Sequence, residues 1–197
     1  MSRHAVAAIL AGGRSRRMGT DKALLLLDGT PLIGHVIARL RPLIAEIVIV
    51  GDSAGAFGRF GIPVIPDPRP DEGPLAGIRT ALMHTDAPLV FCCACDMPFL
   101  ETALVGRLLE LAEQGVAAVV PWMRGEPEPL CAVYAKEALP LIEDVLASGR
   151  RSIRDVLDKM PIRFVEEDDL RHYDPELSSF VNINTPDDLA RVRRSAR

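Results

Sequence analysis

A glycine-rich, basic segment near the N-terminus carries the residue types that could bind a triphosphate. It is the run Leu10–Lys22, with the sequence Leu-Ala-Gly-Gly-Arg-Ser-Arg-Arg-Met-Gly-Thr-Asp-Lys. Glycine lets backbone N–H groups approach a ligand closely, and clustered N–H groups form a concavity that binds anions. Arginine and lysine add formal positive charge. The segment is therefore predicted to bind the phosphates of a nucleotide, the alternative being an ordinary glycine-rich surface turn.

The spacing of this segment excludes two well-known phosphate loops. A P-loop places its lysine directly after a glycine, whereas two residues separate Gly19 from Lys22. The dinucleotide fingerprint GxGxxG fails because Gly12 and Gly13 are adjacent. A nicotinamide dehydrogenase is thereby disfavoured, although Asp52 follows the second expected strand, where such enzymes place a ribose-binding acid.

An aspartate that ends an apolar run could hold a metal ion. Asp96 follows the run Leu89–Cys95, where an unpaired carboxylate would be costly to bury. Mg²⁺ usually takes one or two carboxylates together with phosphate oxygens. Lys22 could neutralise the charge that develops on a transferred phosphorus. The alternatives are an Asp96 carboxylate that accepts backbone N–H bonds at a turn, and a Lys22 that is solvated or paired with Asp21.

Length and composition favour one globular domain over residues 1–197. Hydrophobic residues make up 48% of the chain, which argues against disorder. The 23 basic and 27 acidic residues give a net charge of −4, which argues weakly against nucleic-acid binding. No run reaches the roughly 18 apolar residues of a membrane span, and no signal-peptide pattern precedes the glycine-rich segment. We therefore expect a cytoplasmic protein.

The four cysteines are predicted to be buried apolar residues rather than a metal site. Cys92, Cys93 and Cys95 gather in one apolar run and lack the usual CxxC pairing of a zinc site, and Cys131 stands apart. Free cysteine commonly behaves as a small buried hydrophobe. His35 lies within the first expected helix and is interpreted as structural.

Strand-like and helix-like segments alternate, which predicts a three-layer α/β sandwich with a mainly parallel sheet, Rossmann-like in kind. The expected strands are 5–10, 46–50, 62–65, 89–95, 116–120, 130–134 and 163–167. The expected helices are 31–44 after Thr30 as N-cap, 74–84, 102–113 before Gly115, 136–147, a short one after a Ser152/Asp155 capping box, and one that opens at Thr185-Pro186-Asp187-Asp188. Segments 66–73 and 122–129 are expected to be loops. Because ligands bind at the carboxyl ends of parallel strands, the polar candidates are expected on one rim.

Four motifs resemble one enzyme family. They are the Leu10–Lys22 segment, which fits the signature G-G-x3-R-M-G-x-D-K, then Gly-Pro-Leu-Ala-Gly at 73–77, Cys-Asp-Met-Pro at 95–98, and Val-Asn-Ile-Asn-Thr-Pro at 181–186. In this order they resemble the MobA-like nucleotidyltransferases related to molybdenum cofactor guanylyltransferase. The Leu-Ala-Gly-Gly start and the Gly-Pro-Leu-Ala-Gly segment point to the guanylyl branch, since cytidylyl relatives more often begin Leu-Ala-Ala-Gly.

The resemblance implies a nucleotide-diphospho-sugar transferase fold and a reaction. The phosphate of molybdopterin would attack the α-phosphate of GTP, pyrophosphate would leave, and no covalent enzyme intermediate would form. Mg²⁺ is the implied cofactor. Transient contact with a molybdenum-insertion protein or an apo-molybdoenzyme is an implied partnership, without nucleic acid or membrane.

The resemblance also implies roles for individual residues. Catalysis falls to Lys22, Asp96 and Arg17, with Asp96 as the metal ligand. Nucleotide binding falls to Leu10, Ala11, Gly12, Gly13, Lys22, Asp67, Gly73, Pro74, Gly77 and Asp96, and acceptor binding to Asn182 and Asn184. Arg14 and Arg16 occupy variable positions of the signature.

Each of these implied roles has a structural alternative. Asp67 could serve only a turn, the Gly73–Gly77 segment could be an ordinary helix start, and the asparagines could form an Asx-turn. The segment 124–129 aligns with no family motif, so acceptor contacts there stay open. Functional alternatives are a cytidylyltransferase for the same cofactor, another sugar- or polyol-phosphate nucleotidyltransferase, and a nucleotide-binding regulatory protein without turnover. Intact Asp96 and Lys22 argue against the last.

Overall fold

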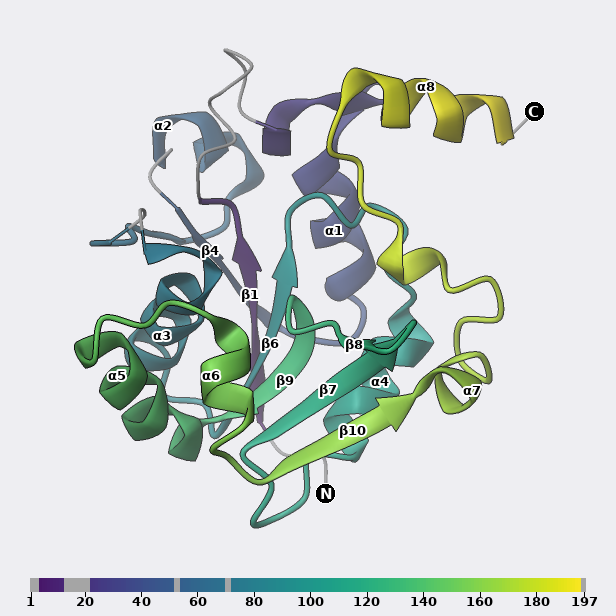
Figure 1. Cartoon of the computed structure of the whole chain (residues 1–197). Helices are drawn as coiled ribbons and strands as arrows, with labels where there is room; N and C mark the ends of the chain where they lie inside the picture. The colour runs from purple at the N-terminus through teal and green to yellow at the C-terminus, as the bar shows by residue number, and fades with distance from the viewer. Residues whose placement is uncertain (1–3, 13–21, 52–53, 70–71, 196–197) are drawn as a thin grey trace.

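The computed structural model describes residues 4–12, 22–51, 54–69 and 72–195 (Figure 1). Within them, an eight-stranded sheet has the order β10-β7-β9-β6-β1-β4-β5, and β8 pairs with β7. A separate two-stranded hairpin joins β2 (Leu26–Leu27) to β3 (Thr30–Pro31). The strands of the large sheet are β1 (Ala5–Leu10), β4 (Glu46–Val50), β5 (Val64–Ile65), β6 (Leu89–Ala94), β7 (Ala118–Met123), β8 (Glu126–Pro127), β9 (Cys131–Ala135) and β10 (Ile162–Glu166).

The sheet is mainly parallel, as the sequence predicts. The strand β1 runs parallel to β4 and β6, β4 to β5, and β7 to β10, whereas β9 is antiparallel to both β6 and β7. The chain passes from β1 to β4 on one side and later returns to β6 on the other side of β1. The strand order therefore reverses between β1 and β6, and open α/β sheets bind ligands outside the carboxyl ends of the strands at such a switch point.

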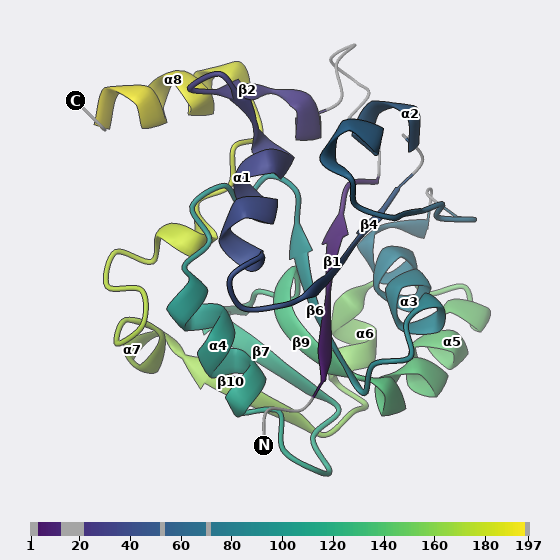
Figure 2. The same cartoon turned by 180° about the vertical axis from the view of Figure 1, so that it is seen from behind.

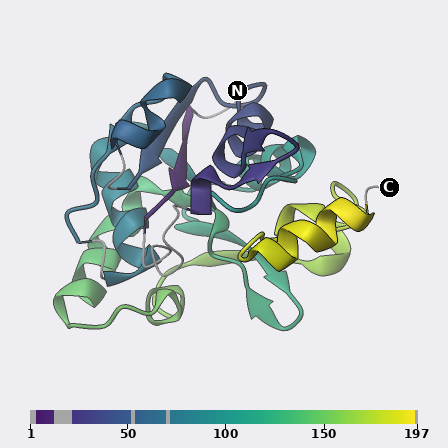
Figure 3. The same cartoon turned by 90° about the horizontal axis from the view of Figure 1, so that it is seen from above.

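Helices cover both faces of the sheet and complete three layers, which confirms the predicted fold class (Figures 1 and 2). The helices α1 (Leu32–Leu40) and α4 (Thr102–Glu110) contribute to the core on one face, and α3 (Pro74–His84), α5 (Leu139–Ala147) and α6 (Ile153–Leu157) to the core on the other. The short helices are α2 (Ala54–Phe57) and α7 (Glu167–Leu170). The last helix, α8 (Pro186–Ser195), lies beside the β2–β3 hairpin at the carboxyl edge (Figure 3).

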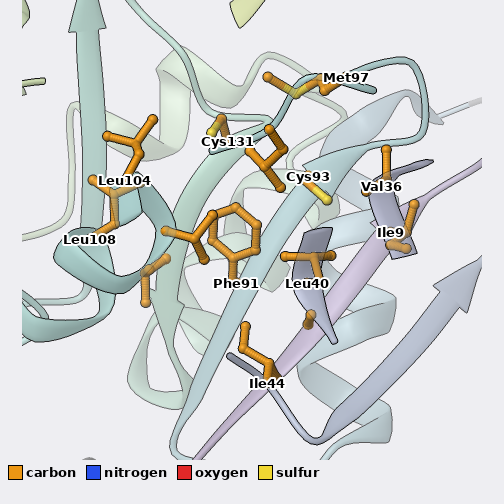
Figure 4. Close-up of a cluster of buried hydrophobic side chains, with 14 of the residues drawn as sticks. Ile9, Val36, Leu40, Ile44, Phe91, Cys93, Met97, Leu104, Leu108 and Cys131 are labelled. Carbon is orange, nitrogen blue, oxygen red and sulfur yellow. The ribbon is translucent and has the colours of Figure 1, made fainter. Parts of the chain in front are cut away.

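Alternation along the central strands divides the core between the two faces. Phe91 and Cys93 of β6 pack with Ile9 of β1 on the α1/α4 face (Figure 4), whereas Val90 and Cys92 pack on the opposite face. Each apolar run is hydrophobic on both sides because helices cover both faces. The apolar periodicity of α1 likewise buries Ile33, Val36, Ile37 and Leu40.

The cysteine prediction is confirmed for three of the four residues. Cys92, Cys93 and Cys131 are fully buried, while Cys95 is partly exposed. Burial raises the pKa of each of the three buried thiols, which therefore stay protonated. In the described part of the chain, no three His, Cys, Asp or Glu side chains gather into a metal site. His35 is structural as predicted, since its Nε2 hydrogen-bonds to the Leu27 carbonyl at 3.0 Å.

The predicted loop at 122–129 is wrong. Residues 122 and 123 continue β7, and the chain turns through Arg124 and Gly125 into β8. Both turn residues have positive φ, 51° and 82°, which is the backbone of a tight β-hairpin turn. The hairpin extends the carboxyl edge of the sheet.

Several predicted helix boundaries also need correction. Thr30 is not the N-cap of α1, because Thr30 and Pro31 form β3 and the cap is Pro31. That helix ends at Leu40, and Leu43 is 40% exposed rather than part of the core. The helix α4 ends at Glu110, and α5 begins at Leu139 after a 3-10 turn over Lys136–Ala138.

The predicted capping box at Ser152 does not form, whereas the predicted helix start at Thr185 is capped. Ser152 precedes α6 but makes no side-chain cap hydrogen bond. At α8 the box forms, because Asp188 N–H donates to Thr185 Oγ1 at 3.1 Å and Asp188 Oδ2 accepts from Thr185 N–H at 2.9 Å. Among the helices that the structure describes, none is long and apolar enough to cross a membrane.

Candidate active site

Three side chains from distant parts of the chain converge at the carboxyl edge of the sheet. The Lys22 ammonium donates to Asp96 Oδ2 and to Asn184 Oδ1. Asp96 follows β6, Lys22 begins a 3-10 turn, and Asn184 precedes α8. The site therefore holds one cationic group between two oxygen acceptors, next to the carboxyl ends of β1 and β6.

Backbone contacts fix Asp96 and Asn184 relative to each other. Cys95 N–H donates to the Leu10 carbonyl at 3.2 Å, so the β1–β6 ladder continues to the residue before Asp96. The Asp96 carbonyl accepts from Ile183 N–H at 3.0 Å. The Ile183 side chain is fully buried with Leu27 and Leu32, and this anchors the segment that carries Asn184.

The α8 capping box holds Asn184 from its other side. Asp188 Oδ2 accepts from the Asn184 N–H at 3.1 Å as well as from Thr185 N–H. Hydrogen bonding with Thr185, then with the two backbone N–H groups, holds the pKa of Asp188 below its ordinary value. The asparagine side chain is thus presented from a segment with several backbone anchors.

Because the Asp96 carboxylate is buried, it needs a positive charge beside it, which the Lys22 ammonium supplies. The side chains of Lys22 and Asp96 are only 16% and 9% exposed. Breaking a buried ion pair by removing one partner costs about 3–5 kcal/mol, because the other charge stays buried and uncompensated. A carboxylate oxygen and an amide oxygen are also ligands that Mg²⁺ accepts, and the ammonium that both now bind is a stand-in for such an ion. The residues present therefore fit a divalent cation.

The glycine-rich segment begins beside this site. Ala11 N–H donates to the Val50 carbonyl at 2.8 Å, which holds the chain against the end of β4. Gly12 is exposed, so its backbone is open to a ligand. The predicted site residues Gly13 and Arg17, together with Arg14, Arg16 and Asp21, lie outside the described residues.

Gly51 borders the glycine-rich segment but belongs to none of the sequence motifs. A Cβ at this position would lie 2.8 Å from the Ala11 carbonyl oxygen and 3.0 Å from its carbon. The end of β4 therefore approaches the glycine-rich segment so closely that only glycine fits. A glycine directly after a β-branched strand was the available signal, but its meaning depends on the pairing of β1 with β4.

The predicted Gly73–Gly77 segment lies against the end of β1. Gly73 has φ 79° and is the N-cap of α3, and Pro74 is the first helical residue. A Cβ on Gly77 would meet the Leu10 side chain at 3.4 Å. The N-terminal turn of α3 therefore borders Leu10, and through it the start of the glycine-rich segment.

Asp67 is buried and makes the contacts of a turn. Its Oδ1 accepts from Arg69 N–H at 3.1 Å and from Thr80 Oγ1–H at 3.4 Å. The structure thus realises the structural alternative for Asp67, and a contact with a nucleotide stays a prediction. Asn182 is exposed like Asn184, on either side of the buried Ile183, as alternation predicts. It lies outside the contacts of Lys22.

The β7–β8 hairpin leads into a partly buried carboxyl, that of Glu128. Glu128 follows β8 and its N–H donates to the Pro121 carbonyl at 2.9 Å. Two residues later, the Leu130 carbonyl accepts from Ala94 N–H at 3.1 Å, at the end of the strand that leads to Asp96. Burial raises the pKa of Glu128, and the Arg124 guanidinium partly opposes that shift. Glu128 lies in none of the four sequence motifs and was not predicted as a site residue.

An αβα sandwich with a glycine-rich segment, a lysine and a carboxylate at its switch point has the features of a nucleotide-transferring enzyme. Residues 7–165 match the MobA-like NTP transferase domain. The chain belongs to this family and is a nucleotidyltransferase of molybdenum cofactor biosynthesis.

Individual relatives agree over nearly the whole chain. The molybdenum cofactor guanylyltransferase of Desulfosudis oleivorans is 36% identical over 190 residues, covering 96% of this chain and 94% of the relative. A probable molybdenum cofactor guanylyltransferase of Methanosarcina mazei is 38% identical, covering 93% of this chain and 87% of the relative. The crystal structure of molybdopterin-guanine dinucleotide biosynthesis protein A from Archaeoglobus fulgidus superposes with a TM-score of 0.84 at 34% identity, covering 97% and 98% of the two chains.

Proposed function

We propose that the enzyme transfers GMP from GTP to the phosphate of molybdenum-molybdopterin, forming the guanine dinucleotide cofactor and releasing pyrophosphate. The names of the relatives support the substrates. The convergence of Lys22, Asp96 and Asn184 is the structural observation that carries the proposal, because it collects phosphate-binding and metal-binding groups at one point of the sheet edge.

The chemistry assigned to these residues is mostly positioning and charge neutralisation. The acceptor phosphate oxygen attacks the α-phosphorus of GTP, and the bond to the bridging oxygen of pyrophosphate breaks. Backbone N–H groups from Gly12 onward orient the triphosphate, and the Lys22 ammonium offsets the negative charge that grows on the phosphoryl oxygens. Asp96 and Asn184 would hold Mg²⁺, which supplies further charge neutralisation when bound.

Binding of the other substrate is assigned to the exposed edge beyond this centre. Asn182 is the proposed acceptor contact, and Asp67 and the Gly73–Gly77 segment are the proposed nucleotide contacts. Because molybdopterin is labile, we propose that a molybdenum-insertion protein or an apo-molybdoenzyme exchanges the cofactor with this enzyme by transient contact.

Thermal stabilisation by GTP, CTP and ATP, each with and without Mg²⁺, tests nucleotide choice before the unstable pterin is prepared. A ligand at about 100 times its Kd stabilises by roughly 2.7 kcal/mol, or on the order of 5–11 °C for a chain of this size. We expect a GTP-selective shift that Mg²⁺ enhances. A larger shift with CTP would instead favour a cytidylyltransferase, and no shift with any nucleotide would refute the assigned site.

Turnover with molybdopterin then tests the reaction, by quantifying the dinucleotide product and pyrophosphate. Lys22→Met and Asp96→Asn should each lower kcat by at least about 10²–10³, the usual effect of removing one charge-stabilising group. Lys159→Met is the matched control, since Lys159 is exposed and follows α6, away from the convergent groups. Near-normal turnover in both site variants would refute the mechanism.

A further inference from the structure

The Lys22 ammonium occupies the position where two metal-type ligands point. It donates to one carboxylate oxygen, Asp96 Oδ2, and to one amide oxygen, Asn184 Oδ1. Carboxylate, amide and phosphate oxygens are the ligands of hard divalent cations, whereas an ammonium group has three donors and suits two or three such acceptors. One group of oxygens can therefore bind either cation.

The ammonium and a divalent cation cannot bind these oxygens together. The two cations would repel each other at close range, and the low exposure of Lys22 and Asp96 limits screening by water. A metal ion that takes Asp96 Oδ2 and Asn184 Oδ1 would therefore displace the lysine from them. The phosphates of a nucleotide offer the displaced ammonium a new set of acceptors.

We propose that Lys22 is an exchangeable internal cation. In the free enzyme it holds the metal position between Asp96 and Asn184, and when the metal and nucleotide bind it moves to the phosphates. The proposal uses the two oxygens assigned to Mg²⁺ above, Asp96 Oδ2 and Asn184 Oδ1, and adds a competition between the lysine and the metal for them. It rests on the proposed function only in taking Mg²⁺ and a nucleoside triphosphate as ligands, so the choice of base does not enter.

The local backbone suits an exchange made by the lysine alone. Asp96 and Asn184 are linked through the hydrogen bond from Ile183 N–H to the Asp96 carbonyl, and Asn184 is also held by Asp188. The backbone after Lys22 is anchored by the fully buried Ala23. The long lysine side chain is thus the part that can swing, while both oxygen ligands stay in place.

Two consequences follow for metal binding. The free enzyme should bind a divalent cation weakly, because the metal competes with a tethered ammonium. Nucleotide should strengthen metal binding beyond simple chelation, because it gives Lys22 another partner. By reciprocity, the metal should then strengthen nucleotide binding by the same factor.

Mn²⁺ titration without nucleotide, followed by the electron paramagnetic resonance signal of free Mn²⁺, tests the proposal without any turnover. Lys22→Met removes the competing charge and should tighten Mn²⁺ binding by roughly 5- to 150-fold, the usual range of coupling between sites. Lys159→Met should bind as the wild type does. In the Lys22→Met background, Asp96→Asn should abolish Mn²⁺ binding and Asn184→Leu should weaken it at least about fivefold.

Thermal melting supplies an independent readout. Lys22→Met leaves the Asp96 carboxylate buried without its ion pair, so the variant should melt below the wild type, and Mn²⁺ should restore much of the difference. If Lys22→Met does not fold, Lys22→Gln keeps an N–H donor for Asp96 while removing the charge, and the same titration applies.

Two results would overturn the proposal. One is Mn²⁺ binding to the Lys22 variants that is no tighter than to the wild type, which would mean that Lys22 is not a competitor. The other is Mn²⁺ binding to the Lys22→Met variant that does not change when Asn184→Leu is added, which would mean that Asn184 does not bind the metal. Neither result depends on GTP selectivity or on molybdopterin, so a failure of the proposed reaction would remain distinguishable.

Discussion

Replacing Gly51 with alanine should destabilise the fold through one identifiable backbone overlap. The new Cβ would lie 2.8 Å from the Ala11 carbonyl oxygen, where ordinary contacts begin at 3.4 Å. Neither side can yield easily, because Ala11 N–H is bonded to the Val50 carbonyl and Gly51 N–H to the Ile65 carbonyl. Overpacking of this kind costs about 1–3 kcal/mol, which corresponds to a fall in Tm of about 2–12 °C at roughly 2–4 °C per kcal/mol.

The assay is thermal melting of the Gly51→Ala variant beside a matched control. Gly55→Ala lies four residues later in α2, and its Cβ would meet nothing within 4 Å. Because alanine also reduces the entropy of the unfolded chain, the control should be as stable as the wild type or up to about 1 kcal/mol more stable. Its Tm should therefore equal or exceed that of the wild type. Displacing Ala11 also displaces Gly12, so Gly51→Ala should show a smaller GTP-induced shift as well. Equal melting of Gly51→Ala and the wild type would refute the reasoning.

Three further outcomes are expected. Gly12→Ala should change Tm little, since its Cβ would lie 3.9 Å from the Gly51 Cα, yet it should abolish stabilisation by GTP in the same melting assay; a retained GTP shift would remove Gly12 from the nucleotide site. The three fully buried cysteines, whose pKa values burial raises, should resist a thiol reagent at pH 8 in the native protein and react after addition of urea, as counted by mass spectrometry. The pKa of Asp188 is lowered from 3.8, so its hydrogen bonds with Thr185 should persist above pH 3.8 and weaken as the pH falls through the lowered pKa. The NMR chemical shift of the Thr185 amide should follow this change with pH. Asp188→Asn should make that shift nearly independent of pH.

The layered fold could be predicted because the central strands β1 and β6 are uninterrupted apolar runs. The run Leu89–Cys95 predicts β6 to within one residue, and the helix Pro74–His84 is predicted with its observed bounds. Both depend on local features, namely strand-length hydrophobicity between covered faces and a glycine-proline helix start. The antiparallel direction of β9 has no such local signal, since it depends on which neighbours the strand finds.

The β7–β8 hairpin escaped prediction because its sequence looks like a loop. Pro121 and Pro127 lack the N–H that a ladder uses, and proline in a strand usually argues against it. Here Pro121 serves as an acceptor for Glu128 N–H, and Pro127 lies on β8, which pairs with β7. The turn itself places Arg124 at φ 51°, a conformation that arginine rarely signals.

Local capping patterns failed at one helix and succeeded at another. Ser152 and Asp155 have the spacing of a capping box, as do Thr185 and Asp188, yet only the second pair forms it. The difference lies outside the motif. The segment before α8 is anchored by the buried Ile183, whereas Ser152 follows an exposed connection. A sequence pattern cannot by itself predict which start is held in place.

In the site, the local sequence indicates individual residues, whereas their contacts depend on the fold. Asp96 and Lys22 could be selected one at a time, from a carboxylate after an apolar strand and a lysine after a glycine-rich segment. Their ion pair could not be predicted, because it joins residues 74 positions apart, and the contact of Lys22 with Asn184 spans 162 positions. The three meet only because β6 lies beside β1 and because the Asp96 carbonyl binds Ile183 N–H. The hydrogen bond from Ile183 N–H links Asp96 to the segment that carries Asn184, so the fold sets the spacing of their two side-chain oxygens. The cation that lies between these oxygens is then the part of the site that can change.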